Sequence, residues 1–250
     1  MKRFFSTLKS LVFPPRCGGC RTLLPTAIGK EAPLFCKECE GEWARELSLQ
    51  CPQCFAAYPD CRCQPTALKN AGSLALVKLA PYGEDTRARV VRAIVLRLKK
   101  APDRRTMDFL AQELESGLLQ ALAKEGCAVT DALLVHVPRD RAARRRTGTD
   151  QAEALARALS RRTGIVHRPL LKRTKRTKIQ KTLTAKERMR NLVDAFAASE
   201  VPSGTCVILV DDVVTTGATT AVAASRLRAA GAEKLITLAI AVTEKKKGRA

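Results

Sequence analysis

Short, almost continuous apolar runs alternate with stretches of helical periodicity from about residue 73 onward. The runs that predict strands are SLALVKLAPY (73–82), ALLVHVP (132–138), VILVDD (207–212) and LITLAIAV (235–242). The segment VHRPLLKR (166–173) is compatible with a further strand. Pro138 would end the run that starts at Ala132, because proline cannot donate to a sheet ladder.

Helical spacing marks the segments between these runs. The helix predicted over 85–100 has its apolar residues at Val90, Val91, Ile94, Leu96 and Leu98. Further helices are predicted over 106–125, 150–163, 184–196 and 218–231. Asp150 and Thr184 stand at N-cap positions, Glu187 completes a capping box with Thr184, and Gly231 ends the last helix.

This alternation predicts an α/β fold with a mainly parallel sheet and helices on both faces. The stretch QPTALKNAG (64–72) would lead as a linker into such a domain, whose bounds are expected at residues 67–250. Residues 1–66 would form a separate N-terminal module.

Cysteines dominate that module, since eight of the ten lie between residues 17 and 63. They form the pairs Cys17-x-x-Cys20, Cys36-x-x-Cys39, Cys51-x-x-Cys54 and Cys61-x-Cys63. The first three have the spacing that lets one turn present two thiolates to the same tetrahedral zinc ion. Disulfides are the alternative, but nothing indicates secretion, and the cytosol keeps thiols reduced. We therefore expect one or two structural zinc sites.

The pairing of these motifs stays open in the sequence. A sequential arrangement would join the first pair with the second and the third with the fourth, whereas a crossed arrangement would join alternate pairs. Cys127 and Cys206 stand alone beside apolar stretches and are expected to be buried small residues.

The N-terminal stretch MKRFFSTLKSLVFPPRC resembles a signal peptide only superficially. Lys9 interrupts its apolar part, and no small-residue cleavage site precedes Pro14 and Pro15. A short amphipathic helix stopped by the prolines is the favoured interpretation. No run reaches the roughly 20 apolar residues of a membrane span, so a cytoplasmic protein is expected.

Basic residues are concentrated in one segment of a chain whose formal net charge is +21. Between Arg139 and Arg190 there are 18 Lys or Arg residues, 4 acids and no Phe, Tyr or Trp. Such a segment attracts phosphates, although a solvated basic surface remains the alternative. The missing aromatics argue against base stacking there.

The stretch VILVDDVVTTGATT (207–220) places two carboxylates at the end of a strand, just before a threonine-rich loop that opens a helix. Ligands of parallel sheets bind at that edge. The helix start and the hydroxyls would bind phosphate, and Gly217 would let the backbone approach it. The carboxylates would accept hydrogen bonds from the vicinal hydroxyls of a ribose. A Walker B strand is excluded, because no GxxxxGK[ST] loop is present.

The same stretch resembles the phosphoribosyl pyrophosphate (PRPP) signature of type I phosphoribosyltransferases. Together with the cysteine pairs and the segments LRLKK, HVPRDRAARRR, DQAEALA, RTKRTKIQKTL and ERMRNLVDAF, it resembles the ComF family of competence-related proteins over about residues 11–245. The resemblance implies a type I phosphoribosyltransferase-like sheet, an N-terminal zinc ribbon, PRPP bound with Mg²⁺, and a link to DNA uptake.

By this resemblance, Asp211 and Asp212 would hold the ribose hydroxyls at the catalytic site. The 5-phosphate would lie on the loop Thr215, Thr216, Gly217, Ala218 and Thr219. Arg139 and Arg141 would face the pyrophosphate, and Mg²⁺ would bind mainly through its oxygens. Gln180, Arg188 and Asn191 match family positions, with either a site role or a scaffolding role.

The sequence departs from the family at the acceptor end of the site. Thr147-Gly148-Thr149-Asp150-Gln151 replaces the usual Arg-Gly-Phe-Asn-Gln, Lys100 replaces a frequent tyrosine, and His136 replaces a common proline. His136 and His167 are interpreted as lone structural histidines. Arg144 to Arg146 could close over pyrophosphate, contact nucleic acid, or keep a loop soluble.

Three functions are compatible with these features. The chain could be a phosphoribosyltransferase with an unidentified acceptor. It could be a catalytically silent PRPP-binding protein that handles single-stranded DNA and meets the DNA-uptake machinery. It could also be a zinc-ribbon adaptor that contacts other proteins.

Overall fold

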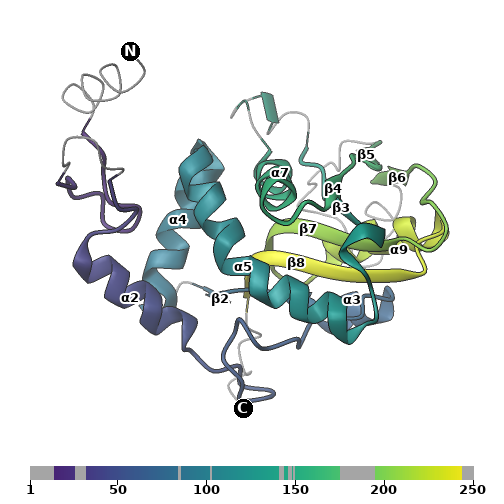
Figure 1. Cartoon of the computed structure of the whole chain (residues 1–250), viewed down its shortest axis with the longest axis horizontal. Coiled ribbons are helices and arrows are strands. Elements are labelled where there is room, and N and C mark those ends of the chain that lie inside the picture. The colour runs from purple at the N-terminus through teal and green to yellow at the C-terminus, as the bar shows by residue number, and fades with distance from the viewer. Residues whose placement is uncertain are drawn as a thin grey trace, which may run out of the picture.

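A parallel sheet flanked by helices forms the centre of the computed structural model (Figure 1), which describes residues 14–25, 32–83, 86–101, 103–140, 144–145, 148, 150–174 and 195–243. The strands run in the order β1-β8-β7-β3-β4, with β2 also paired to β8, and all these pairs are parallel. Their bounds are Leu76–Val77 (β1), Ala80–Tyr82 (β2), Ala132–His136 (β3), Val166–His167 (β4), Cys206–Val214 (β7) and Lys234–Thr243 (β8). The α/β fold predicted from the sequence is confirmed.

The central strands are mostly apolar because both faces of the sheet are covered. Alternate residues of β3, β7 and β8, such as Leu134, Ile208 and Ile236, pack into one core cluster with α4, α5 and α7. Their neighbours in sequence, such as Leu133, Val207 and Leu235, pack into a second cluster with α9.

Two of the described helices begin at a capping side chain of their own segment. The helices are Lys37–Leu47 (α2), Thr66–Asn70 (α3), Arg89–Lys100 (α4), Arg104–Lys124 (α5), Gln151–Thr163 (α7) and Ala218–Ala229 (α9). Asp103 caps α5 through Thr106 N–H, and Asp150 caps α7 through Glu153 N–H, as its position predicts. Among the described residues, no helix has the length and apolar character needed to cross a membrane.

The structure corrects several predicted boundaries. The strand predicted over 73–82 is split into β1 and β2, and β7 continues two residues past Asp212. The segment 166–173 divides between β4 and a strand of a separate antiparallel pair, β5 (Leu171–Arg173) with β6 (Phe196–Ala198). Leu96 is 43% exposed and does not belong to the buried face of α4.

Two helical predictions fall mostly or wholly outside the described residues. The N-terminal helix lies there entirely. The helix predicted over 184–196 does so up to its end, where Phe196 begins β6 instead.

A carboxylate of the N-terminal segment completes the start of α4. Ala88, the N-cap residue of α4, offers no side-chain cap. Glu46 of α2 is fully buried and accepts hydrogen bonds from Val90 N–H (2.7 Å) and Val91 N–H (2.9 Å). Nearby, Trp43 Nε1 donates to Glu113 of α5 at 2.9 Å. The helix α2 is therefore fixed to α4 and α5 by buried polar contacts as well as by packing.

We expect Glu46→Ala to lower the free energy of unfolding by about 2–4 kcal/mol, because it leaves two buried N–H groups without an acceptor. The matched control is Glu40→Ala, an exposed glutamate of the same helix, which should change it by less than about 0.5 kcal/mol. Urea unfolding followed by circular dichroism measures both. Equal losses for the two variants would contradict the capping role.

Candidate metal centres and phosphoribosyl site

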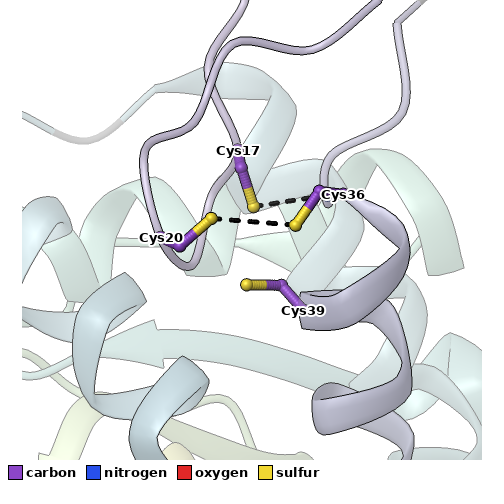
Figure 2. A group of neighbouring side chains, drawn as sticks. All are labelled: Cys17, Cys20, Cys36 and Cys39. Carbon is purple, nitrogen blue, oxygen red and sulfur yellow. Dashed lines mark hydrogen bonds between the residues drawn. The ribbon is translucent and has the colours of Figure 1, made fainter.

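The first cysteine cluster joins the loop at residues 17–20 to the start of α2. The sulfurs of Cys17, Cys20, Cys36 and Cys39 all lie within 4.8 Å of one another (Figure 2). Cys36 is the N-cap residue of α2 and Cys39 lies in its first turn, so the helix itself presents both thiols. A Cβ at Gly19 would lie 2.7 Å from Cys39 Sγ, which explains a glycine between the first two ligands. Arg97 of α4 donates to the Gly18 carbonyl at 3.2 Å and fixes this loop to the core.

The second cluster consists of Cys51, Cys54, Cys61 and Cys63, whose sulfurs also lie within 4.8 Å of one another. Its last pair is one residue shorter than the others, and the intervening Arg62 is held by α5. Arg62 donates to the Gly117 carbonyl at 3.0 Å and to Gln120 Oε1 at 3.3 Å. The shorter spacing of Cys61 and Cys63 therefore occurs where Arg62 fixes the cluster to α5.

The two Cys-x-x-Cys turns at residues 17–20 and 51–54, here called knuckles, share one backbone conformation. Arg21 N–H donates to Cys17 O (3.1 Å), and Phe55 N–H donates to Cys51 O (2.9 Å). The residue after the second cysteine has a positive φ in both, 72° at Arg21 and 60° at Phe55. Short antiparallel bridges, Arg16 to Leu23 and Gln50 to Ala57, close both turns.

Four thiols so close together need a cation if all are to ionise. Burial raises the pKa of Cys17, but N–H groups of Cys36, Cys20 and Gly19 outweigh it and lower the pKa to about 6. Burial and the neighbouring sulfurs raise the pKa of Cys63 to about 12. Tetrahedral zinc with four thiolates fits both clusters, and all ten cysteines are free of disulfides. The sequential pairing is confirmed, and the crossed alternative is wrong.

The remaining two cysteines lie together rather than alone. Cys206 is buried at the start of β7, and Cys127 is half-buried just before β3. Burial and the hydrogen-bonded thiol of Cys127 raise the pKa of Cys206, so this thiol is unreactive. Both line a cavity of about 70 Å³ at the amino ends of the strands, away from the carboxylates.

The paired carboxylates lie just beyond the last residues of β7 that pair with β3. The pairing of β3 ends with His136 opposite Val210, whereas β7 pairs with β8 up to Val214. Asp211 and Asp212 are both half-buried. Asp211 accepts hydrogen bonds from Thr220 Oγ1 (2.7 Å) and Asp212 N–H (2.9 Å). Burial, and secondarily the charge of Asp212, raises the pKa of Asp211 to about 8.

Thr220 is a site residue that the sequence analysis did not assign. It is 2% exposed and lies one turn inside α9, from which it orients the Asp211 carboxylate. Its signal was its place as the last threonine of the TTGATT run. A pattern cannot tell which of four neighbouring threonines points inward.

The predicted phosphate loop leads directly into α9. Gly217 is the N-cap residue, with φ +79°, a conformation that favours glycine. Thr215 and Thr216 are exposed, Ala218 and Thr219 are partly exposed, and Thr216 Oγ1 accepts from Ala218 N–H at 3.4 Å. The loop is thus an open helix start beside Asp211.

Of the predicted pyrophosphate residues, only Arg139 is described. Its N–H donates to Asp150 Oδ2 at 2.8 Å. The other oxygen of Asp150 caps α7, so this side chain connects the residue after β3 to the start of α7. Arg144 forms an ion pair with Glu153 (3.5 Å). The buried Gln151 donates to the Leu98 carbonyl at 2.8 Å, a structural contact. The predicted residues Arg141, Gln180, Arg188 and Asn191 lie outside the described residues.

The two histidines are partners rather than lone residues. His136 Nδ1 and His167 Nε2 lie 3.0 Å apart across β3 and β4. Burial lowers the pKa of both, that of His167 to about 4. Two neutral imidazoles can share one hydrogen bond, so the pair satisfies itself within the sheet edge.

We expect purified protein to contain two zinc ions per chain, one in each cluster. Cys20→Ser and Cys54→Ser each remove one exposed ligand from a different cluster and should each lower the zinc content by about one ion per chain. Cys127→Ser is the control and should leave the zinc content unchanged. Elemental analysis measures all three. A full complement in either ligand variant would contradict the assignment.

Comparison with known proteins places the chain in a family. No family model matches. The chain is 30% identical to DNA utilization protein YhgH of Salmonella typhimurium over 225 residues, which is 89% of this chain and 94% of that protein. The same protein of Escherichia coli K12 is 30% identical over 228 residues, with the same shares covered. Competence protein F of Haemophilus influenzae is 40% identical over 95 residues, 36% of this chain and 41% of that protein. The chain therefore belongs to the ComF family of competence-related proteins.

Proposed function

We propose that the chain binds phosphoribosyl pyrophosphate with Mg²⁺ at the carboxyl end of β7. The observation that carries this proposal is the Thr220–Asp211 hydrogen bond, which holds a carboxylate beside an open helix start. Structural carboxylates in a core are rare unless they are paired. Asp211 has no cationic partner among its hydrogen bonds, and burial raises its pKa, so the fold bears a cost at this position.

The two halves of the site suit the two halves of a sugar phosphate. The α9 start offers backbone N–H groups and a positive helix end to an anion, and the adjoining hydroxyls can donate to it. Repulsion prevents Asp211 and Asp212 from facing the same anion. As ionised carboxylates they only accept, so the O–H groups of the ribose hydroxyls can donate to them.

The leaving end of the ligand would lie toward β3. Arg139 begins the basic segment after that strand, and Asp150 holds its backbone. Mg²⁺ would bind through pyrophosphate oxygens and water, with the cationic segment offsetting the remaining charge. A transfer reaction would need an acceptor, and the departures at TGTDQ fall where the acceptor would lie.

The relatives' names suggest a context for this site. They are named for DNA utilization and for competence, and we propose that this chain also serves the handling of incoming DNA. Its net charge of +21 suits a phosphate-rich partner.

Calorimetric titration with PRPP and Mg²⁺ tests the site. Asp211→Asn combined with Asp212→Asn should weaken binding by about 10- to 100-fold or more, since hydrogen bonds to charged groups contribute about 1.5–3 kcal/mol. Glu200→Gln combined with Glu233→Gln, which changes two exposed carboxylates, is the charge-matched control and should bind like the wild type. Full affinity in the double variant would overturn the ribose assignment.

The affinity should also depend on pH through Asp211. Its raised pKa of about 8 means that the carboxylate holds a proton at neutral pH, whereas ribose hydroxyls form stronger hydrogen bonds to the ionised form. PRPP affinity should therefore increase between pH 7 and 9. Asp211→Asn has no proton to lose, so the difference between the two pH profiles isolates this residue from the ionisation of PRPP. Parallel profiles would contradict a role for Asp211 ionisation.

DNA binding is a second activity that the charge distribution favours. Arg144 and Arg145 are exposed within the segment that holds 18 basic residues. Affinity for a single-stranded oligonucleotide should fall steeply with salt, and replacing Arg144 to Arg146 with Gln should reduce the slope of log K against log salt by roughly 2. Replacing Lys37, Lys69 and Lys124 with Gln, three exposed lysines outside the basic segment, is the comparison for total charge. An unchanged slope would remove the arginine run from the DNA-binding surface.

A further inference from the structure

We propose that the second cysteine cluster positions the phosphate loop, so that metal binding at Cys51, Cys54, Cys61 and Cys63 supports the ligand site about Gly217. This proposal rests on the proposed function for the identity of the ligand. The connection between cluster and loop is carried by three successive sets of contacts.

The first contacts anchor the cluster to the edge of the sheet. Lys78 lies between β1 and β2 and is only 1% exposed. Its ammonium group donates to Cys61 Sγ (3.2 Å), Cys61 O (3.0 Å) and Cys63 O (2.9 Å). A buried ammonium is costly unless it is paired with negative charge, and thiolates on a metal supply that charge. The second cluster therefore stabilises the buried Lys78 between β1 and β2, and Lys78 in turn stabilises the cluster.

The second contacts carry the anchor into α3. The chain leaves the cluster at Cys63 and enters α3 two residues later through Pro65, its N-cap residue. Gln64 Nε2 donates to the Ser73 carbonyl at 2.7 Å, which ties both ends of this short helical segment together. Leu68 of α3 is fully buried. A helix of one turn has little stability of its own, so its place depends on these attachments.

The third contacts join α3 to the loop. A Cβ on Gly217 would lie 3.1 Å from Pro65 Cβ and 3.4 Å from Leu68 Cγ, so the loop backbone rests directly on α3. Leu68 belongs to one core cluster with Cys51 and Cys61 of the metal site, and with Val214 and Ala221 on either side of the loop. The same small core thus contains two of the metal ligands and the residues on either side of the loop.

The first cysteine cluster has different surroundings. Cys17 and Cys39 belong to the core cluster of α4, α5 and α7, to which none of the buried residues flanking the loop contributes. The proposal therefore assigns the positioning role to the second cluster alone.

The test compares three variants in the full-length, zinc-loaded protein. Leu68→Ala removes the contact with the loop. Lys78→Met removes the ammonium group that contacts Cys61 and leaves all four metal ligands in place. Leu110→Ala is the packing control, because Leu110 is also fully buried but lies on α5. Lys69→Met, an exposed lysine on α3, is the control for Lys78. Circular dichroism and zinc content verify that each variant is folded and loaded.

Two measurements follow, and one of them needs no ligand. Hydrogen exchange of the backbone amides at 215–221 should accelerate roughly tenfold or more in Leu68→Ala and Lys78→Met, while both controls stay near the wild type. PRPP affinity should fall by roughly tenfold in the same two variants, because binding must then restore the order of the loop, at a free-energy cost of about 1.4 kcal/mol. Lys78→Met should also release zinc faster to a chelator.

Unchanged exchange at 215–221 in Leu68→Ala, or equal acceleration in Leu110→Ala, overturns the positioning role. If the wild type binds no PRPP, the proposed function fails, and hydrogen exchange still decides whether the cluster supports the loop. If the wild type binds PRPP and both test variants bind it equally well, the positioning proposal fails while the function stands.

Discussion

The strand β7 pairs in parallel with β3 and β8, and its pairing with β3 ends earlier than its pairing with β8. The rest of the site depends on this difference. On one side, β3 ends at His136, opposite Val210. On the other side, β8 continues alongside β7 to Val242. Among the described strands, the residues of β7 after Val210 therefore pair with β8 alone. Asp211 occupies the first position after this step, where a carboxylate can be held by the sheet and still meet a ligand.

Buried and half-buried ionisable side chains join separate elements of this molecule. Glu46 joins α2 to the start of α4, Lys78 joins the second cysteine cluster to β1 and β2, and Asp211 joins β7 to α9. In each case the charged group meets several hydrogen-bond partners, which offsets its loss of hydration. Apolar packing could hold the same elements together, but it would not fix one register between them, because apolar contacts lack direction.

The sequence predicted the elements whose signal is local and missed the contacts that only the fold creates. Continuous apolar runs indicated buried parallel strands, and Asp150 indicated a helix start, because both depend on neighbours in the chain. The break of the first strand at Lys78 could not be predicted, since the partner of that lysine is a distant thiol. The same holds for the histidine pair, the Cys127–Cys206 pair and the inward orientation of Thr220. The choice between sequential and crossed cysteine pairing depends on how the knuckles pack, which spacing does not specify.

The two knuckles are copies of one design placed in unequal surroundings. Both belong to clusters of four cysteines, and in both the residue after the second cysteine has a positive φ. Their surroundings differ, because the ammonium group of Lys78 lies against Cys61 of the second cluster. Groups around the ligands tune how tightly a site holds its metal. Two metal ions bound by the same ligands would therefore leave at different rates, which isotope or cobalt exchange would separate.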